Sequence, residues 1–328
     1  MPCIIRDKTL IIPADVISIE DSEFYNNKTF MSIYFEPREL GCSIGNSAFK
    51  SCYIKTLLIP KQVIIIGNHA FADNMWLDSV QFEHREPNMP LILSEHIFDN
   101  CDIREIIIPP FITEIQSLAF FQNKKLRSII FEPRGNLLLR QSDNLLPQKI
   151  NTVLSLKIGK SVFANCNIGP SLIIPNFVII IGNLAFCLST NLIDLAFEPR
   201  DTQLIIGRYA FEKCSLNGSL IIHPQIKIEN SAFLNNIHLR KVIISKEYIL
   251  IAERIFKCNC SLSHIQFIEY YGDVHNKERR AQFLIFRHVV KKINRLLPWL
   301  PENKMKNLLK ILSLTRYDYL ARHIESFI

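Results

Sequence analysis

The residues most able to do chemistry are nine cysteines, nine histidines and a short motif that places an acid beside a base. Phe-Glu-Pro-Arg occupies residues 35–38, 131–134 and 197–200, and Phe-Glu-His-Arg occupies residues 82–85. A carboxylate next to a guanidinium could serve proton transfer, could dock a charged partner or could mark a turn. The positions of these residues in the wider sequence decide among the three.

The histidines form no pattern that supports nucleophilic catalysis. We expect six of them to fall at different places in the repeat described below: His69, His84, His96, His223, His238 and His264. No recurring Ser/His/Asp or Cys/His arrangement is present, nor a dinucleotide-binding or zinc-protease motif. Cys258 and Cys260 lie near a histidine but lack the spacing of a four-ligand zinc site. The sequence therefore predicts no enzyme activity, no metal and no cofactor.

A phenylalanine recurs every 22–27 residues, with one interval of 43, and it divides the chain into similar units: Phe24, Phe49, Phe71, Phe98, Phe120, Phe163, Phe186, Phe211, Phe233 and Phe256. A degenerate copy at about 138–158 would fill the long interval and give about eleven coils of about 22–25 residues. Alternating apolar residues that end at proline are typical of a strand followed by a turn. A unit this short cannot bury its own apolar face, so successive units must stack. We expect a β-rich, right-handed solenoid over residues 1–268.

Two segments carry the repeat most clearly: IPKQVIIIGNHAFADNMWLDSV (59–80) and IPNFVIIIGNLAFCLSTNLIDL (174–195). Both match the unit IPxxVxxIGxxAFxxCxxLxxI, so the chain resembles the BspA-type leucine-rich repeats over about residues 4–268. The resemblance implies a leucine-rich-repeat solenoid without catalytic activity. It also implies the association of that family with surface antigens and with protein binding.

Four cysteines share one position, three residues after the recurring phenylalanine: Cys52, Cys101, Cys166 and Cys214. Other coils place asparagine there: Asn27, Asn74, Asn123, Asn236 and Asn259. A position that accepts either residue is interpreted as a small, buried, hydrogen-bonding slot. A disulfide needs Cα atoms within about 7 Å, whereas coils two apart lie about 10 Å from each other. We therefore expect unpaired thiols, which favour a reducing compartment.

The middle residue of each predicted strand points away from the core, because side chains alternate along a strand. That row is mostly apolar, and its members are Ile11, Tyr34, Leu58, Gln81, Ile107, Ile130, Ile173, Ala196, Ile221, Ile243 and Gln266. A polar row lies beside it, two residues earlier in each strand. An exposed apolar stripe of this length is typical of a contact surface. Two alternatives are that β-branched residues simply favour strands, or that the inward and outward faces are reversed.

Residues 269–328 lack the repeat and are predicted to be helical. Residues 276–328 carry twelve Lys and Arg against four Asp and Glu, a net charge of +8 that leaves −1 on residues 1–275. We interpret this segment as a helical cap or as a docking segment for an acidic protein or an anionic membrane, with a nucleic acid disfavoured. The candidate docking residues are Arg279, Arg280, Arg287, Lys291, Lys292 and Arg295.

The function predicted is a non-catalytic protein–protein interaction scaffold that presents the outer face of its sheet to a macromolecular partner. One alternative is a cell-surface adhesin or antigen, and another is a hydrolase with a site assembled across coils. No secretory signal and no membrane-spanning run is visible, which together with the unpaired thiols favours a cytoplasmic location. The resemblance makes the cell surface the alternative location.

Within this framework Phe-Glu-Pro-Arg is predicted to be a corner of the coil. The phenylalanine takes the last inward position of a strand, and the proline ends the ladder because it has no N–H to donate. The glutamate and arginine are then expected to face solvent, with a charged rim beside the apolar stripe as the alternative role.

Overall fold

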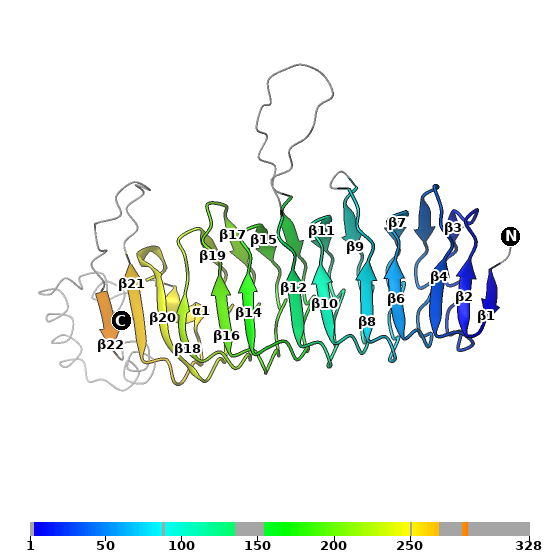
Figure 1. Ribbon diagram of the computed structural model, residues 1–328. Coiled ribbons are helices and arrows are strands. Elements are labelled where there is room, and N and C mark those ends of the chain that lie inside the picture. The colour runs from blue at the N-terminus through cyan, green and yellow to red at the C-terminus, as the bar shows by residue number, and fades with distance from the viewer. Residues whose placement is uncertain (1–2, 87–88, 135–153, 250, 269–283, 288–328) are drawn as a thin grey trace, which may run out of the picture.

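The computed structural model describes residues 3–86, 89–134, 154–249, 251–268 and 284–287, and they form a solenoid of stacked coils (Figure 1). The coils follow one another in chain order along the length of the molecule, so each coil packs against the coil before it and the coil after it. Each complete coil has two strands and one turn segment. The predicted fold class is confirmed.

The first strand of each coil contributes to one long parallel face, which we call face A. Its strands are β2 (Thr9–Ile12), β4 (Ser32–Phe35), β6 (Thr56–Ile59), β8 (Ser79–Phe82), β10 (Glu105–Ile108), β12 (Ser128–Phe131), β14 (Ser171–Ile174), β16 (Asp194–Phe197), β18 (Gly218–Ile221), β20 (Leu239–Ser245) and β21 (His264–Ile268). An antiparallel strand covers each end of this face. β1 (Ile4–Arg6) pairs with β2, and β22 (Leu284–Arg287) pairs with β21.

β22 corrects the expectation for the carboxyl-terminal segment. Residues 284–287 were predicted to lie in a helix because apolar residues recur there every three or four positions. They form a strand instead, with Phe267 opposite Leu284 and His264 opposite Arg287. The open edge of β21 offers unpaired backbone groups, and the apolar run Leu-Ile-Phe suits a strand, so pairing outweighs the helical pattern.

The second strand of each coil builds face B. Its strands are β3 (Ser18–Ile19), β5 (Cys42–Ile44), β7 (Val63–Ile66), β9 (Leu91–Leu93), β11 (Ile112–Ile115), β13 (Leu156–Ile158), β15 (Val178–Ile181), β17 (Leu204–Ile206) and β19 (Ile226–Ile228). They form hydrogen-bonded sheets of three and six strands. After β20 the chain forms the 3₁₀ helix η1 (Lys246–Tyr248) and the short helix α1 (Ala252–Ile255) where this strand would stand.

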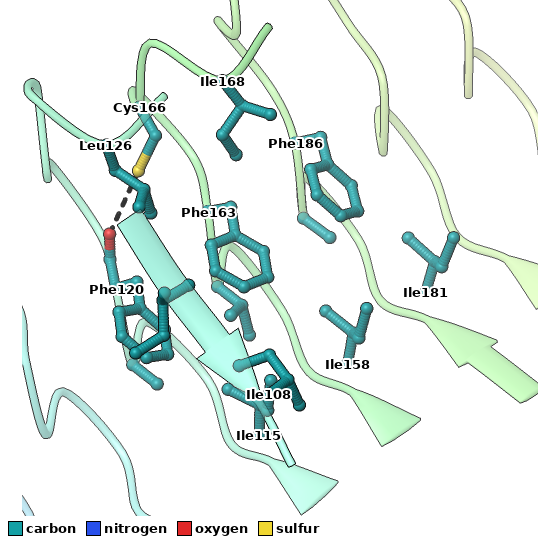
Figure 2. Close-up of a cluster of buried hydrophobic side chains, with 14 of the residues drawn as sticks. Ile108, Ile115, Phe120, Leu126, Ile158, Phe163, Cys166, Ile168, Ile181 and Phe186 are labelled. Carbon is teal, nitrogen blue, oxygen red and sulfur yellow. Dashed lines mark hydrogen bonds between the residues drawn. The ribbon is translucent and has the colours of Figure 1, made fainter. Parts of the chain in front are cut away.

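The turn segment places the recurring phenylalanine in the core, where ten rings stack in one column. Figure 2 shows three of them, Phe120, Phe163 and Phe186. Successive ring centroids lie between 5.1 Å and 5.7 Å apart. The residue two positions after each phenylalanine has a positive φ, and Asn, Asp or Ser often fills it because these residues tolerate the left-handed region. Stacked rings and buried leucine and isoleucine side chains make one continuous hydrophobic core.

The predicted degenerate coil at 138–158 is wrong. Phe120 stacks directly on Phe163 at 5.3 Å, and β11 pairs with β13, so no coil lies between them. The interval of 43 residues is one coil with an insertion between Arg134 and β13, part of which lies outside the described residues. Ten phenylalanines mark ten coils. Face A has eleven parallel strands because β2 precedes the first phenylalanine.

From β2 to β16, face A is built of strand pairs, whereas β18, β20 and β21 form one continuous ladder. β2 with β4, β6 with β8, β10 with β12 and β14 with β16 each match over four positions. β4 with β6 and β8 with β10 match at one position, and no ladder joins β12 to β14 or β16 to β18. Glu36 N–H donates to the Ile12 carbonyl within a pair, but the equivalent residue at the next junction is Pro60, which has no donor. Proline in alternate coils therefore sets a period of two coils.

A second feature explains why no ladder joins β12 to β14 or β16 to β18. Cys52 and Cys101 lie four residues before the polar residue of their strand, whereas Cys166 and Cys214 lie five residues before it. Each extra residue is accompanied by a glycine with positive φ, Gly169 at 152° and Gly218 at 78°. The added residue displaces β14 and β18 relative to the strand before each of them.

Candidate interaction surface

The outward row of face A is exposed, as predicted. Tyr34, Leu58, Ile107, Ile130, Ile173 and Ile221 have exposed fractions between 41% and 58%. Gln81 and Ala196 are exposed, Ile11 and Ile243 are half-buried, and Gln266 on the last parallel strand is buried. The flanking residues Leu57, Ile59 and Ile106 are buried, so the inward and outward faces are not reversed.

Face B also exposes isoleucines, which we did not anticipate: Ile17, Ile64, Ile65, Ile92 and Ile205. The middle residues of segments such as LIL and LII could have indicated them. Charged residues interrupt this apolar row of face B. On neighbouring strands Glu114 pairs with Ile92, Lys157 pairs with Glu114, and Lys227 pairs with Ile205. Between β4 and β18 the central row of face A carries no charged side chain. Face A is therefore the more continuous apolar surface.

Face A is hollowed where its ladder is interrupted. A cavity of about 360 Å³ lies at the junction of β16 and β18, and its lining includes Leu195, Ala196 and Leu220. Asn217 N–H donates to the Ile193 carbonyl at the edge of this junction.

The arginines of the Phe-Glu-Pro-Arg motif are not solvent-facing, so that expectation is wrong. Arg38, Arg85 and Arg200 are buried. The Arg200 guanidinium donates to the carbonyls of Pro175 at 2.8 Å and Val178 at 2.9 Å, which belong to the turn of the preceding coil. Burial lowers the pKa of Arg134, the fourth member, to about 10, so its guanidinium keeps its charge near neutral pH.

The glutamate of the motif contacts the same turn from the other side. The Glu198 carboxylate accepts from the Asn176 N–H at 3.0 Å, and the Glu83 carboxylate accepts from the Lys61 N–H at 2.9 Å. Glutamate and arginine together clamp the preceding coil at its Ile-Pro turn. The sequence predicted a corner of the coil here, but not the clamp that its glutamate and arginine form. In the coil of β20, Tyr248 takes the place of the arginine, and its hydroxyl donates to the Ile226 carbonyl at 2.6 Å.

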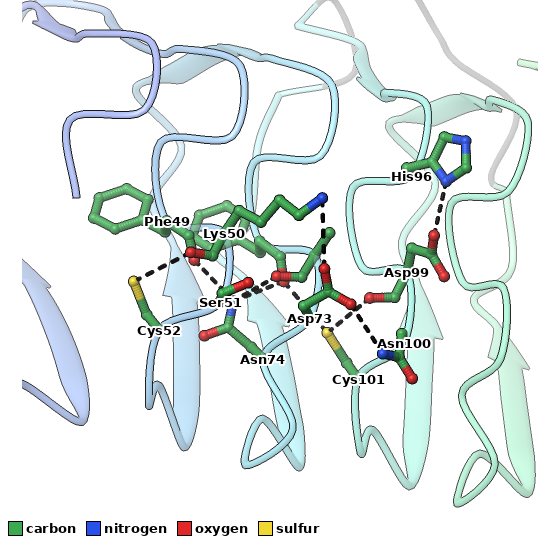
Figure 3. A network of polar contacts seen from close by, with 12 residues as sticks. Phe49, Lys50, Ser51, Cys52, Asp73, Asn74, His96, Asp99, Asn100 and Cys101 are labelled. Carbon is green, nitrogen blue, oxygen red and sulfur yellow. Dashed lines mark hydrogen bonds and ion pairs between the residues drawn. The ribbon is translucent and has the colours of Figure 1, made fainter. Parts of the chain in front are cut away.

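The cysteine and asparagine slots are buried and hydrogen-bonded, as predicted, except that Asn27 in the first coil is half-buried (Figure 3). Asn74 Nδ2 donates to the Phe49 carbonyl at 2.9 Å, and Cys101 Sγ donates to the Phe71 carbonyl at 3.3 Å. Each contact ties a coil to the one before it. All nine thiols are free. Among the described residues no cluster of His, Cys, Asp and Glu could hold a metal, and Cys258 and Cys260 are exposed.

Burial of the slot predicts a clear division of thiol reactivity. Burial raises the pKa of Cys52 to about 11 and that of Cys166 to about 12, so neither forms the nucleophilic thiolate at pH 8. We expect iodoacetamide to alkylate Cys258 and Cys260 in the folded protein and to leave the slot cysteines unmodified. Peptide mass spectrometry measures this directly, with the protein in denaturant as the control in which all nine react. Alkylation of Cys166 as fast as Cys258 would contradict the structural assignment.

Two histidines occupy the same position in neighbouring coils, contrary to the expectation that the histidines scatter. His69 and His96 stack with ring centroids 4.3 Å apart, and His96 Nδ1 lies 2.8 Å from Asp99 Oδ2. Burial, followed by the charge of His96, lowers the pKa of His69, and burial raises the pKa of Asp99. The cluster links neighbouring turns, as does the contact of Lys50 with Asp73 at 3.5 Å (Figure 3).

A family model for the BspA-type leucine-rich-repeat region matches residues 5–127 and 156–277 in six copies. The chain belongs to this family. The match covers the phenylalanine stack and every parallel strand of face A except β12, and it passes over the insertion after Arg134. A comparison with curated proteins found no match.

The BspA-type chain is similar to several solved structures at low identity. The pneumococcal vaccine antigen PcpA is 17% identical, with a TM-score of 0.49 over 79% of this chain and 67% of that one. A leucine-rich cell surface protein of Faecalibacterium prausnitzii is 19% identical, with a TM-score of 0.39 over 81% and 79%. A leucine-rich-repeat protein from Bacteroides ovatus is 19% identical, with a TM-score of 0.40 over 76% and 83%.

Most of the basic docking candidates of the BspA-type chain lie outside the described residues: Arg279, Arg280, Lys291, Lys292 and Arg295. Arg287 lies at the end of β22. Whether this segment caps the solenoid or binds an acidic protein or an anionic membrane stays a prediction. In the part of the chain that the structure describes, no helix is long and apolar enough to cross a bilayer.

Proposed function

We propose that the protein is a non-catalytic scaffold that binds another protein through the outward row of face A. The observation that carries this proposal is the row of uncharged, mostly apolar side chains that face outward from Tyr34 to Ile221. An apolar surface of this extent on a soluble protein is typical of a contact site. The residues on either side of each outward side chain are buried in the core or packed against it. The surface is therefore rigid and loses little conformational entropy on binding.

The partner suited to this surface is a protein with a flat, largely apolar face. Ser, Thr and a few charged residues flank the apolar row and can form the polar rim of such an interface. Thr9 and Ser32 already bond through their hydroxyls at 2.9 Å, and Ser171 lies 3.5 Å from Asp194. Membership of a leucine-rich-repeat family supports protein binding rather than catalysis.

The test is a double substitution in the centre of the row, Ile107→Lys with Ile130→Lys. We expect the variant to fold, since both side chains face outward, and to lose more than about tenfold in partner affinity, because two buried ammonium groups would lack partners in the interface. Affinity capture from the source organism, with mass spectrometry, identifies proteins that the wild-type chain retains and the variant loses. Their affinities are then measured with purified proteins.

The matched control is Ile92→Lys with Ile205→Lys, which places the same charges at similarly exposed positions of face B. We expect it to retain the partner. Equal retention of the partner by both double variants would show that face A is not the binding surface. Unfolding of the face A variant would assign Ile107 and Ile130 to the core and end the proposal.

A cell-surface adhesin or antigen is the runner-up, because the family is associated with surface antigens. The name of one similar structure describes a vaccine antigen, and that of another describes a cell surface protein. The cytoplasmic location expected from the thiols stays a prediction. Labelling intact cells with an impermeant reagent separates the two: a surface protein is modified and a cytoplasmic protein is not.

A further inference from the structure

A second surface lies on the edge where each coil passes from its slot residue to face A. In the second and third coils this edge exposes large side chains. Trp76 is 61% exposed, Met75 is 53% exposed and Tyr53 is 41% exposed. Tyr53 and Trp76 lie with ring centroids 6.4 Å apart in an edge-to-face arrangement, and Lys28 Nζ lies 4.4 Å from the centroid of the Tyr53 ring.

The repeat itself provides the evidence that these side chains are not needed for stacking. At the position of Trp76, two residues after the slot, the corresponding coils carry Thr29, Lys125, Asn191, His238 and Ser261. At the position of Tyr53, the other cysteine coils carry Asp102, Asn167 and Ser215. The same backbone therefore forms with polar residues at both positions. Exposed aromatic residues that the fold does not require are typical of binding hot spots.

Trp76 and Met75 line a hollow. A groove of about 580 Å³ lies at this edge, and its lining combines the apolar Met31, Met75 and Trp76 with the charged Lys55, Asp78 and Arg104. The charged residues stand in register, because Asp78 N–H donates to the Lys55 carbonyl at 3.0 Å and Arg104 N–H donates to the Asp78 carbonyl at 3.3 Å. Neighbouring coils thus hold them at strand spacing, about 4.8 Å apart.

The charges of the groove favour an anionic ligand of low charge density. Lys125 forms an ion pair with Asp102, which neutralises one acid of the lining. Lys55 and Arg104 have no ion-pair partner within the described ranges. Asp78 stands between them and can accept a hydrogen bond from a backbone N–H of a bound peptide, whereas it would repel a phosphate placed between Lys55 and Arg104. The groove therefore suits a few carboxylates rather than a polyphosphate backbone.

We propose that this groove binds a short acidic segment of a partner protein, with one apolar side chain of the segment against Trp76 and Met75 and its carboxylates at Lys55 and Arg104. The site is separate from the outward row of face A. Its affinity arises from burial of the exposed indole and thioether together with charge-assisted hydrogen bonds to the guanidinium and ammonium. Added salt weakens such binding.

The experiment selects peptides from a phage-displayed random library on the full chain and measures their affinities in solution. We expect selected peptides to combine Asp or Glu with a large apolar residue, and to lose more than about tenfold in affinity with Trp76→Ala and with Lys55→Glu plus Arg104→Glu. A peptide with its acids exchanged for lysine should recover affinity for the double variant. A single-stranded oligouridine serves as the nucleic-acid probe and should bind more weakly than the peptide.

The matched controls are His238→Ala, at the same coil position as Trp76, and Lys157→Glu, an exposed charge on face B; both should bind as the wild type does. Thermal unfolding of every variant confirms folding. A selection without binding peptides, peptides without acidic residues, or undiminished affinity with Trp76→Ala would contradict the proposal. Tighter, Trp76-dependent binding of the oligouridine would also contradict it.

Discussion

Replacing Phe186 with alanine is expected to destabilise the solenoid by about 3–5 kcal/mol, the range measured when a buried aromatic ring leaves a cavity. The Phe186 ring is fully buried and lies 5.3 Å from Phe163 and 5.1 Å from Phe211. Each coil contacts only its two neighbours, so a cavity in the middle weakens both adjacent interfaces. Urea unfolding monitored by circular dichroism measures the loss.

Phe24→Ala is the control for this prediction. Phe24 is the first ring of the stack, is half-buried and has a stacked neighbour on one side only, Phe49 at 5.3 Å. We expect less than about half the loss measured for Phe186→Ala, because fewer contacts disappear and water can enter the site. Equal losses at both positions would show that the phenylalanine stack does not propagate stability from coil to coil.

Replacing Arg200 with methionine is expected to cost about 2–4 kcal/mol. Methionine keeps much of the apolar stem but removes the charged donor from the carbonyls of Pro175 and Val178, and a hydrogen bond to a charged group contributes about 1.5–3 kcal/mol. Removing the guanidinium also removes the free-energy penalty of burying its charge, which offsets part of this loss of stability. The measurement is again the free energy of unfolding in urea.

Arg208→Met provides the matched control. The Arg208 side chain is 63% exposed, and its Nε lies 3.6 Å from Glu229. A surface pair of this kind contributes little, so we expect a change within about 0.5 kcal/mol. If Arg200→Met is no more destabilising than Arg208→Met, the motif is a solvent-facing corner after all and the clamp is wrong.

The repeat made much of this fold predictable. The phenylalanine interval, the strands ended by proline and the shared cysteine and asparagine position follow from local patterns that recur in most of the coils, so chance agreement is small. The outward direction of Ile107 was predictable for the same reason, since alternation along a strand fixes which side chains face the core. The slot was recognised because one position accepted two residues of similar size and hydrogen-bonding ability.

The errors arose where a residue's role depends on the coil before it. Arg200 has the composition of a surface turn, and only the stacked turn at Pro175 supplies the carbonyls that bury it. Trp76 was not predicted as a binding residue, because the repeat pattern describes the residues that the coils share. Trp76 matters because it is a residue in which one coil differs from the others. The apolar residues around Leu284–Arg287 have helical spacing, but this segment forms a strand because it pairs with the free edge of β21.

The binding role of face A is the central claim, and site-specific photo-cross-linking tests it most directly. A photoreactive amino acid replaces Ile107 in one variant of the full chain and Ile92 in another, and each variant is irradiated with the captured partner. We predict a cross-linked product from position 107 and none from position 92. Cross-linking from position 92 alone, or from neither position while the complex remains intact, would contradict the assignment of face A as the binding surface.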